Sequence, residues 1–408
     1  MPGHVLIVGA GQAGAQAAMS LRQLGFAGRI TMAGAEADLP YERPPLSKEY
    51  LAGERTADRL LLRPPAFWAE REVAIRLETR IAKIDPGRGT ATTDSGETIG
   101  WDRLIWAAGG RARRLAVPGG GLANVHVIRT RADVDRLRAD LHTARRVGVV
   151  GGGYIGLEAA AVLAKGGREV TVVEAMPRLL QRVTGPEVSD FFRAEHAAHG
   201  VSVRLGATVA ALEGTHRAER IRLGDGDAIE TDLVIVGIGL EPEVAPLLDA
   251  GAEAALSGVM VDAHGRTRLP GIYAAGDCAA HASRFAAGAV VRLESVQNAV
   301  DMAKAAAQHI VAGDAAAPHD ACPWFWSNQY DLKLQTVGLS HGADARLVRG
   351  DPAGRSWSLV YLRAGAVVAL DCINAPRDYV QGRALVERGA RPDPGRLADP
   401  AVPLKELL

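Results

Sequence analysis

The chain has 408 residues, of which 48% are hydrophobic, enough for two or three domains with cores of their own. Its 47 basic and 47 acidic side chains balance, so the composition favours neither a nucleic-acid-binding protein nor a polybasic membrane anchor. The sequence lacks the run of about 18 apolar residues that a membrane-spanning helix needs, and the first expected strand begins at Val5, which leaves little room for a signal peptide. We therefore expect a cytoplasmic protein.

Cysteine and histidine give no sign of a metal site. Cys278, Cys322 and Cys372 are isolated, so we expect no dithiol redox centre, no iron–sulfur cluster and no zinc site. The 11 histidines lack ligand spacing. His196 and His199 are expected on a solvated helix face.

A strand followed by a glycine-rich turn lies near the N-terminus. Residues 5–8 lead into Gly9-Ala10-Gly11-Gln12-Ala13-Gly14, and an alanine-rich helical stretch follows. Glycines at this spacing allow a tight turn and bring the backbone close to a pyrophosphate at a helix N-terminus. A second strand at 29–32 leads to Glu36, an acid at the distance where such folds bind a ribose. The pattern predicts a dinucleotide-binding βαβ motif.

The same signature recurs in the middle of the chain. Residues 147–150 lead into Gly151-Gly152-Gly153-Tyr154-Ile155-Gly156, and a strand at 169–173 leads to Glu174. A carboxylate there accepts hydrogen bonds from both ribose hydroxyls and repels a 2′-phosphate, which favours NADH. Arg178 and Arg182 follow, so tolerance of NADPH stays open. Two motifs imply two dinucleotides on one chain.

Closing strands set the expected domain boundaries. Residues 101–110 close the first motif, 233–239 close the second, and 269–277 read as the missing last strand of the first. The second domain is therefore expected to be an insertion. The expected bounds are 1–111 and 237–316 for the discontinuous first domain and 112–236 for the inserted one.

The character of the sequence changes beyond Pro318. Candidate strands at 332–337, 357–362 and 366–370 and a helix at 377–388 predict a small α+β domain over 317–408. The expected fold is therefore α/β, with two Rossmann-like three-layer nucleotide-binding domains and a small C-terminal α+β domain.

Together these features resemble the FAD-dependent pyridine-nucleotide oxidoreductases, specifically the ferredoxin reductases that serve Rieske-type oxygenases and bacterial cytochromes P450. The likeness covers nearly the whole chain. The Pro-Pro-Leu-Ser-Lys run is its most discriminating landmark, because disulfide reductases and peroxide-reducing relatives place a redox cysteine in that part of the chain. The landmarks are Pro44-Pro45-Leu46-Ser47-Lys48, Gly156-Leu157-Glu158, Gly276-Asp277, Glu294-Ser295-Val296-Gln297-Asn298-Ala299 and Pro323-Trp324-Phe325-Trp326-Ser327.

The resemblance implies that the first domain binds FAD. Relatives often have an acid at the position of Ala35, where this chain departs and Glu36 would substitute. Three structural alternatives without a functional role stay open. Arg129 could be a solvated strand end, Trp326 a core residue, and Arg43 with Lys48 an ordinary surface pair. The implied FAD contacts are Gly9, Gly11, Ala13 and Gly14 at the pyrophosphate, Ala35, Glu36 and Ile81 at the adenosine, Asp277 at the ribityl or pyrophosphate region, and Arg43, Lys48, Arg129, Val296 and Trp326 elsewhere along the cofactor.

The inserted domain would bind NADH. Lys48 and Glu158 are expected to form an ion pair beside flavin N5, although Glu158 also fits a simple partner of its helix dipole. The implied NADH contacts are Gly153, Ile155 and Gly156 at the phosphates, Glu174 at the ribose, Arg182 at the adenosine, and Ile238 and Gly239 at the nicotinamide.

The implied activity is transfer of electrons from NADH through FAD, one at a time, to a small acidic 2Fe-2S ferredoxin. Two alternatives remain: an NADH oxidase or peroxidase, and a flavin-bound interaction protein like the relatives of apoptosis-inducing factor. Electrostatic docking of a ferredoxin needs a basic patch. The candidates for that patch are Arg284, Arg292, Arg377 and Arg383.

Overall fold

The computed structural model describes residues 3–408. The chain divides into two compact units. Segment Arg43–Arg59 groups with unit 2, although unit 1 flanks it in sequence. The predicted three-domain bounds stay a prediction. Unit 1 comprises the chain up to Glu42, Leu60–Arg111 and Glu241–Pro323, and unit 2 comprises Arg43–Arg59, Ala112–Leu240 and Trp324–Leu408.

Unit 1 is built on a five-stranded parallel sheet with the order β20-β7-β1-β2-β3. Its central strands are continuous apolar runs, as expected for a sheet covered on both faces. β20 pairs in parallel with β7, with Tyr273 opposite Ile105, which confirms the late strand expected to complete the first sheet. The strands are β1 (His4–Val8), β2 (Arg29–Ala33), β3 (Val73–Arg76), β7 (Arg103–Trp106) and β20 (Ile272–Ala274).

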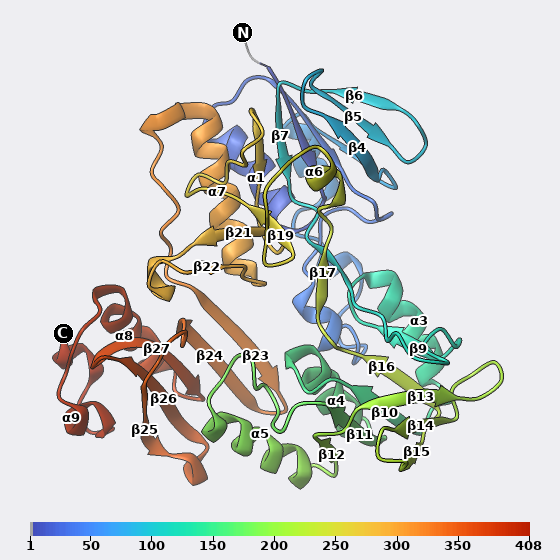
Figure 1. Cartoon of the computed structure of the whole chain (residues 1–408), viewed down its shortest axis with the longest axis vertical. Helices are drawn as coiled ribbons and strands as arrows, with labels where there is room; N and C mark the ends of the chain where they lie inside the picture. Colours follow the sequence, from blue (N-terminus) through green and yellow to red (C-terminus); the bar gives the residue numbers. More distant parts are fainter. Residues whose placement is uncertain (1–2) are drawn as a thin grey trace. The chain divides into compact units, whose positions relative to one another are not determined.

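Helices α1 (Gln12–Gln23) and α7 (Val296–Ala312) lie side by side in unit 1 (Figure 1). Buried alanines on both helices, such as Ala17 and Ala303, allow this close packing. The remaining elements are α2 (Pro65–Glu70), α6 (Ala245–Asp249), an antiparallel sheet of β4 (Ile81–Asp85), β5 (Thr90–Thr93) and β6 (Thr98–Gly100), and a sheet of β18 (Ala254–Ala255), β19 (Gly258–Met260), β21 (Ala279–Ala282) and β22 (Val290–Val291).

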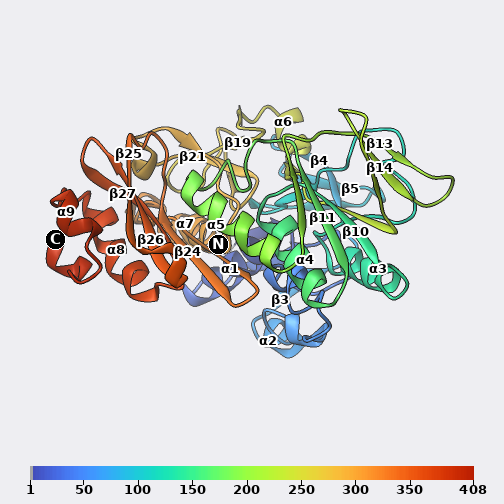
Figure 2. The same cartoon turned by 90° about the horizontal axis from the view of Figure 1, so that it is seen from below.

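Unit 2 contains a second parallel sheet with the same plan. Its order, β12-β11-β10-β16-β9, matches that of unit 1 read from the opposite edge. Figure 2 shows α4 and α5 beside this sheet. The elements are β9 (Val125–Val127), α3 (Arg131–Leu141), β10 (Arg146–Val150), α4 (Tyr154–Lys165), β11 (Glu169–Glu174), α5 (Pro186–Ala198), β12 (Ser202–Leu205), β16 (Leu233–Val236), and the antiparallel β13 (Val209–Glu213), β14 (Arg220–Leu223) and β15 (Ala228–Glu230).

The C-terminal part of unit 2 is an antiparallel sheet with the order β23-β24-β27-β26-β25. Helix α8 packs on β27 and β24. The three strands and the helix expected here are confirmed, and β23 and β25 are additional strands. The elements are β23 (Trp324–Gln329), β24 (Leu332–Gly338), β25 (Ala345–Asp351), β26 (Ser356–Arg363), β27 (Ala366–Ile373), α8 (Pro376–Arg388) and α9 (Pro394–Ala398).

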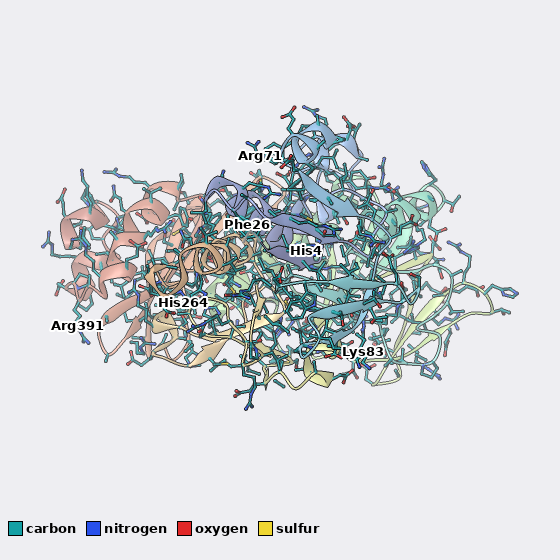
Figure 3. The ribbon with its side chains drawn as sticks, turned by 90° about the horizontal axis from the view of Figure 1, so that it is seen from above. His4, Phe26, Arg71, Lys83, His264 and Arg391 are labelled. Atoms are coloured by element: carbon teal, nitrogen blue, oxygen red, sulfur yellow. The ribbon has the colours of Figure 1, made fainter. Side chains whose placement is uncertain are left out.

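Two short paired strands, β8 (Gly110–Ala112) and β17 (Leu240–Pro242), lie where the chain passes between the units. Charged side chains such as Arg71 and Lys83 lie at the surface of unit 1 (Figure 3). Across residues 3–408 no helix has the length and apolar character needed to cross a membrane.

Candidate functional site

The first glycine turn is shaped by backbone packing. Gly9 has φ +110°, and a Cβ on it would lie 2.2 Å from the carbonyl oxygen of Ala107. A Cβ on Gly14 would lie 1.9 Å from the carbonyl oxygen of Gly9. Gly11 differs, because no atom of the described chain lies within 4 Å of its would-be Cβ. Two glycines are therefore needed by the fold, and the middle one leaves open space at the start of α1.

The second turn repeats this arrangement. A Cβ on Gly151 would lie 2.4 Å from the Gly237 oxygen, and one on Gly156 would lie 2.2 Å from the Gly151 oxygen. For Gly153, as for Gly11, no atom of the described residues lies within 4 Å of the would-be Cβ. Within residues 3–408 no side chain caps the N-terminus of α1 or α4. The first N–H groups of an α-helix have no partner within the helix, so the two turns fit the phosphates of two dinucleotides.

Unit 1 brings two further predicted FAD residues, Asp277 and Val296, toward the start of α1. A Cβ on Gly276 would lie 3.3 Å from the Cβ of Ala13 and 3.5 Å from that of Ala299. Asp277 follows Gly276 and is half-buried. Val296 begins α7, whose N-cap Ser295 accepts a 3.1 Å hydrogen bond from the Asn298 N–H. Asp277 and the N-terminus of α7 therefore lie beside the first glycine turn.

The adenosine end of this site has a different character. Ala35 is exposed, and Glu36 accepts a 2.6 Å hydrogen bond from the Tyr41 hydroxyl. Ile81 is 5% exposed and packs in the core of unit 1. Its predicted contact with adenine stays a prediction, since the structure gives this side chain a packing role.

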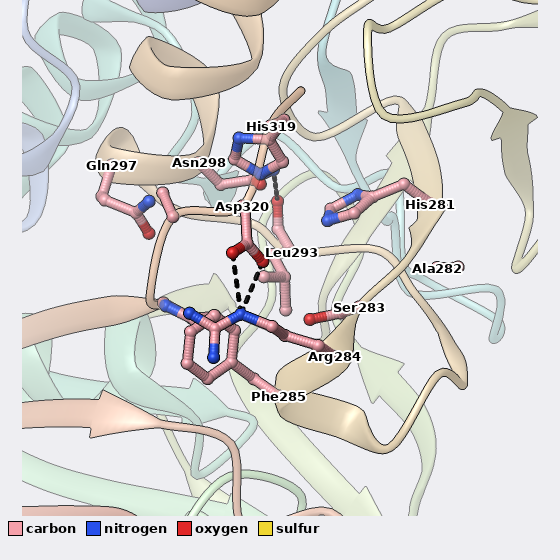
Figure 4. A pocket seen from close by; sticks show the side chains of 12 residues that line it. His281, Ala282, Ser283, Arg284, Phe285, Leu293, Gln297, Asn298, His319 and Asp320 are labelled. Carbon is pink, nitrogen blue, oxygen red and sulfur yellow. Dashed lines mark hydrogen bonds and ion pairs between the residues drawn. The ribbon is translucent and has the colours of Figure 1, made fainter. Parts of the chain in front are cut away.

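A small cavity of about 20 Å³ lies near the start of α7 (Figure 4). Its walls include His281, His319 and the ion pair of Arg284 with Asp320, whose Nε–Oδ1 distance is 2.6 Å. Burial, and to a smaller extent the neighbouring His319, lowers the pKa of His281 to about 4. The cavity has room for about one water molecule, so it is not a cofactor site.

The segment that carries Lys48 is anchored within unit 2. Arg43 Nη1 donates to the Arg129 carbonyl at 2.7 Å, and the Tyr50 hydroxyl donates to Asp135 at 2.5 Å. Residues Pro44–Ser47 form a 3₁₀ turn with two prolines, which restrict the backbone ahead of Lys48. Arg43 and Lys48 are thus parts of a docked segment, and the interpretation of the two as a surface pair is not supported.

Lys48 and Glu158 form the predicted ion pair, with 2.6 Å between Nζ and Oε2. Their side chains are 11% and 4% exposed. Ser47 also donates to Oε2 at 2.5 Å, and Ser327 donates to Oε1 at 2.7 Å. Three donors converge on one buried carboxylate, which is more than an interaction with the dipole of α4 requires. Ser47 and Ser327 were not given a role from the sequence, although each lies inside one of the landmark runs, Pro44–Lys48 and Pro323–Ser327.

Glu174 holds the second glycine turn. Its two oxygens accept hydrogen bonds from the N–H groups of Gly152, at 2.6 Å, and Met176, at 2.7 Å. Arg178 donates to the Thr184 carbonyl and the Ser189 hydroxyl, so its guanidinium is already engaged. The exposed Arg182 lies about 4 Å from the would-be Cβ of Gly239, which brings two predicted NADH residues together.

Other predicted residues lie at half-exposed positions of unit 2. Ile155 is 45% exposed on the first turn of α4. Ile238 is half-buried next to Gly239. Trp326 is half-buried, and its ring lies 5.6 Å from that of Trp324. Neither of these tryptophans is a fully enclosed core residue.

The prediction for His196 was wrong. Its side chain is buried in α5, and Nε2 lies 2.8 Å from the Gln329 Oε1 while Nδ1 lies 2.9 Å from the Tyr330 hydroxyl. His199 is exposed as expected. The C-terminal sheet packs over the face of α5 that holds His196. The sequence of the helix alone cannot predict this burial. The spacing of two polar residues, Ser327 and Gln329, on one face of β23 was the available signal for a buried polar face.

The three cysteines are buried and form no disulfide. Burial raises the pKa of the Cys278 thiol to about 12, so it stays protonated and unreactive near neutral pH. Among the described residues no cluster of metal-ligating side chains occurs. These thiols are packing residues.

The four arginines proposed for docking have different surroundings. Arg284 pairs with Asp320, Arg292 with Glu294 and Arg383 with Glu387, while Arg377 is exposed on α8. The side chain of Arg292 is only 15% exposed. Arg284 and Arg292 belong to unit 1 and the other two to unit 2. A shared docking patch stays a prediction.

Two family models together match most of the chain. Residues 3–303 match the pyridine nucleotide-disulphide oxidoreductase family, and residues 324–408 match the reductase C-terminal domain. The chain therefore belongs to the pyridine nucleotide-disulphide oxidoreductase family.

Individual relatives are more specific. The chain is 58% identical, over 98% of its length and 97% of the relative's, to the ferredoxin reductase subunit of 5,5′-dehydrodivanillate O-demethylase from a Sphingobium species. It is 52% identical, over 99% and 97%, to a ferredoxin–NAD(P)⁺ reductase from a Sphingomonas species. It also resembles putidaredoxin reductase in its covalent complex with putidaredoxin, with a TM-score of 0.95, 37% identity and coverage of 99% and 98%.

Proposed function

We propose that this protein is an FAD-dependent NADH:ferredoxin reductase that supplies electrons to an oxygenase through a 2Fe-2S ferredoxin. The observation that carries the proposal is the pair of matching glycine turns together with a buried Lys48–Glu158 ion pair. Full-length likeness to ferredoxin reductases supports it. The absence of a reactive thiol among the described cysteines argues against the disulfide and peroxide chemistry of other family members.

The two cofactors have separate places on the chain. FAD would lie on the first glycine turn, near Asp277 and the N-terminus of α7, and NADH on the second turn near Glu174. When bound, flavin accepts two electrons from a nicotinamide and releases them singly, which is the conversion that an iron–sulfur acceptor requires. The chain itself has to bind both dinucleotides and hold charge near the reacting rings.

Lys48 is the residue to which the family resemblance assigns the second task. Its ammonium group is held by Glu158 and by the Pro44 carbonyl, at 3.0 Å. We infer that it stabilises negative charge on the reduced isoalloxazine, with Glu158 fixing its position. A fixed ammonium group in a site that largely excludes water stabilises a nearby negative charge more strongly than an ammonium group in water, because less solvent has to reorganise.

NADH is the preferred donor in this proposal. The Glu174 carboxylate would accept hydrogen bonds from the ribose hydroxyls and repel a 2′-phosphate. Arg178 is engaged by Thr184 and Ser189 and is poorly placed to bind such a phosphate. Of the two arginines that follow Glu174, only Arg182 is left as a candidate to bind a 2′-phosphate.

A comparison of electron acceptors tests the proposal. The FAD-loaded protein is given NADH and either ferricyanide, oxygen, or cytochrome c with and without a 2Fe-2S ferredoxin. The proposal expects reduction of ferricyanide and a reduction of cytochrome c that depends on added ferredoxin. Rapid oxygen consumption alone would indicate an oxidase. NADH-induced changes in shape without turnover would indicate an interaction protein.

We further propose that the protein works in the cytoplasm. NADH is a cytoplasmic donor, and cysteines that form no disulfide suit a reducing compartment. Fractionation of the native cells with an antibody against the protein tests this, and recovery mainly from the periplasmic fraction would contradict it.

A further inference from the structure

Glu158 is the end of a buried chain of polar side chains. Gln329 Nε2 lies 3.3 Å from Ser327 Oγ, and Ser327 donates to Glu158 Oε1. His196 and Tyr330 continue the chain beyond Gln329. Ser327, Gln329 and His196 are each at most 1% exposed. All of these residues belong to unit 2.

The carboxylate fixes the direction of every hydrogen bond in this chain. A carboxylate can only accept hydrogen bonds, so the Ser327 hydroxyl donates its one proton to Glu158. The Ser327 oxygen must then accept a hydrogen bond from the NH₂ group of Gln329. The Gln329 carbonyl oxygen then faces His196, which has to donate from Nε2. His196 Nδ1 is left as an acceptor for the Tyr330 hydroxyl. Burial lowers the pKa of His196 to about 4, which keeps the ring neutral, as this pattern needs.

We propose that Ser327, Gln329, His196 and Tyr330 form a directed hydrogen-bond chain that orients the Glu158 carboxylate and, through it, Lys48. They are positioning residues for electron entry from NADH, and this inference rests on the function proposed above. All four donors point the same way, toward the carboxylate, so each bond polarises the next. The chain also ties α5 to β23, and so links the nucleotide-binding part of unit 2 to its C-terminal sheet.

Flavin reduction in anaerobic stopped-flow mixing with NADH tests the effect on rate. Ser327→Ala is expected to lower the limiting rate constant about tenfold, as for loss of one hydrogen bond to a charged group, with little change in the NADH concentration that gives half of this rate. Ser327→Thr keeps the hydroxyl and should recover most of the rate. Ser358→Ala is the matched control, because Ser358 is a buried serine of the same sheet that donates to another carboxylate, Asp378, at 3.0 Å.

The tautomer of His196 gives a second readout that does not involve turnover. Long-range ¹H–¹⁵N spectra of the FAD-bound protein, with His196→Gln to assign the signal, should show a single tautomer protonated at Nε2. Ser358→Ala should leave it unchanged, whereas Ser327→Ala should give a mixture because Gln329 is then free to flip. A wild-type ring protonated at Nδ1, or a Ser327→Ala ring still protonated only at Nε2, would overturn the directed chain.

Glu158→Gln separates this inference from the proposed function. If Glu158→Gln leaves flavin reduction unchanged, the role of the ion pair itself is refuted. If Glu158→Gln slows reduction while Ser327→Ala behaves like Ser358→Ala, the ion pair stands and the positioning chain is refuted.

Discussion

At the residue scale, Glu174 combines two tasks in one carboxylate. It accepts two backbone N–H groups, so it shapes the glycine turn at the same place where it would meet a ribose. Hydrogen bonds from backbone amides hold its oxygens in a fixed orientation. The carboxylate can therefore select for a ribose by geometry as well as by charge.

This double role predicts the behaviour of Glu174→Gln. The variant is expected to raise the KM for NADH about tenfold, the usual weight of one hydrogen bond to a charged group, and to narrow the preference for NADH over NADPH. Steady-state kinetics with ferricyanide and both nucleotides check this. Glu169→Gln, at an exposed position on the same strand, serves as the control, and an equal effect in the two variants would contradict the assignment.

Residues differ in how far the sequence reveals them. Gly9, Gly14, Gly151 and Gly156 could be predicted, because their requirement arises from local turns whose pattern is contiguous in sequence. The Lys48–Glu158 pair was expected only through a family resemblance. The burial of His196 could not be predicted, since its partners Gln329 and Tyr330 lie far along the chain and meet it only when the C-terminal sheet packs on α5.

At the scale of elements, the two strand–turn–helix motifs are copies with the same division of labour. In each, the first and last glycines avoid backbone clashes and the middle glycine leaves the helix N-terminus open. The local sequence was therefore sufficient to predict these elements and the strands β7, β16 and β20, but not β9, an edge strand of the second sheet. The docking of Arg43–Arg59 in unit 2 was not predicted, because it depends on long-range contacts such as that of Tyr50 with Asp135.

Alanine at the middle glycines separates binding from folding. Gly11→Ala is expected to fold, since its Cβ meets no described atom within 4 Å, but to bind FAD at least about tenfold more weakly because the methyl group blocks the approach of a phosphate. Flavin fluorescence during titration of the apoprotein measures this. Gly87→Ala, on a surface turn of unit 1 with an ordinary 3.4 Å contact, is the control.

Gly153→Ala extends the comparison to the second motif. It should retain FAD with unchanged affinity and raise the KM for NADH, because the two nucleotides use different turns. Loss of FAD from Gly153→Ala, or an unimpaired response of Gly11→Ala to FAD, would show that the assignment of the turns is wrong.

At the scale of the whole molecule, buried histidines link folding to pH. The pKa values of His196 and His281 are lowered to about 4, chiefly by burial, so both rings are neutral in the folded chain between pH 4 and 6.5 and protonated in the unfolded chain. Each therefore contributes stability that is present above its unfolded pKa and is lost as the pH falls. The buried carboxyl of Asp371, whose pKa burial raises to about 7, acts in the opposite direction over this range.

The slope of stability against pH can be tested with one variant. His281→Asn should reduce the loss of unfolding free energy between pH 6 and pH 4.5 by about 1.4 kcal/mol per pH unit, the value for one proton. Urea unfolding at a series of pH values measures the slope. His341→Asn, at an exposed position, should leave it unchanged, and a His281→Asn slope equal to that of wild type would contradict the buried, neutral state of this ring.

The central claim is that one chain binds FAD on its first glycine turn and NADH on its second, and passes electrons from NADH to FAD. Anaerobic titration of the FAD-loaded protein with NADH, followed by flavin absorbance, tests it most directly. We predict that about one equivalent of NADH bleaches the flavin and that later addition of about two equivalents of oxidised 2Fe-2S ferredoxin, each of which accepts one electron, restores its colour. A protein that cannot take up FAD, or one that stays yellow in excess NADH, would contradict the account.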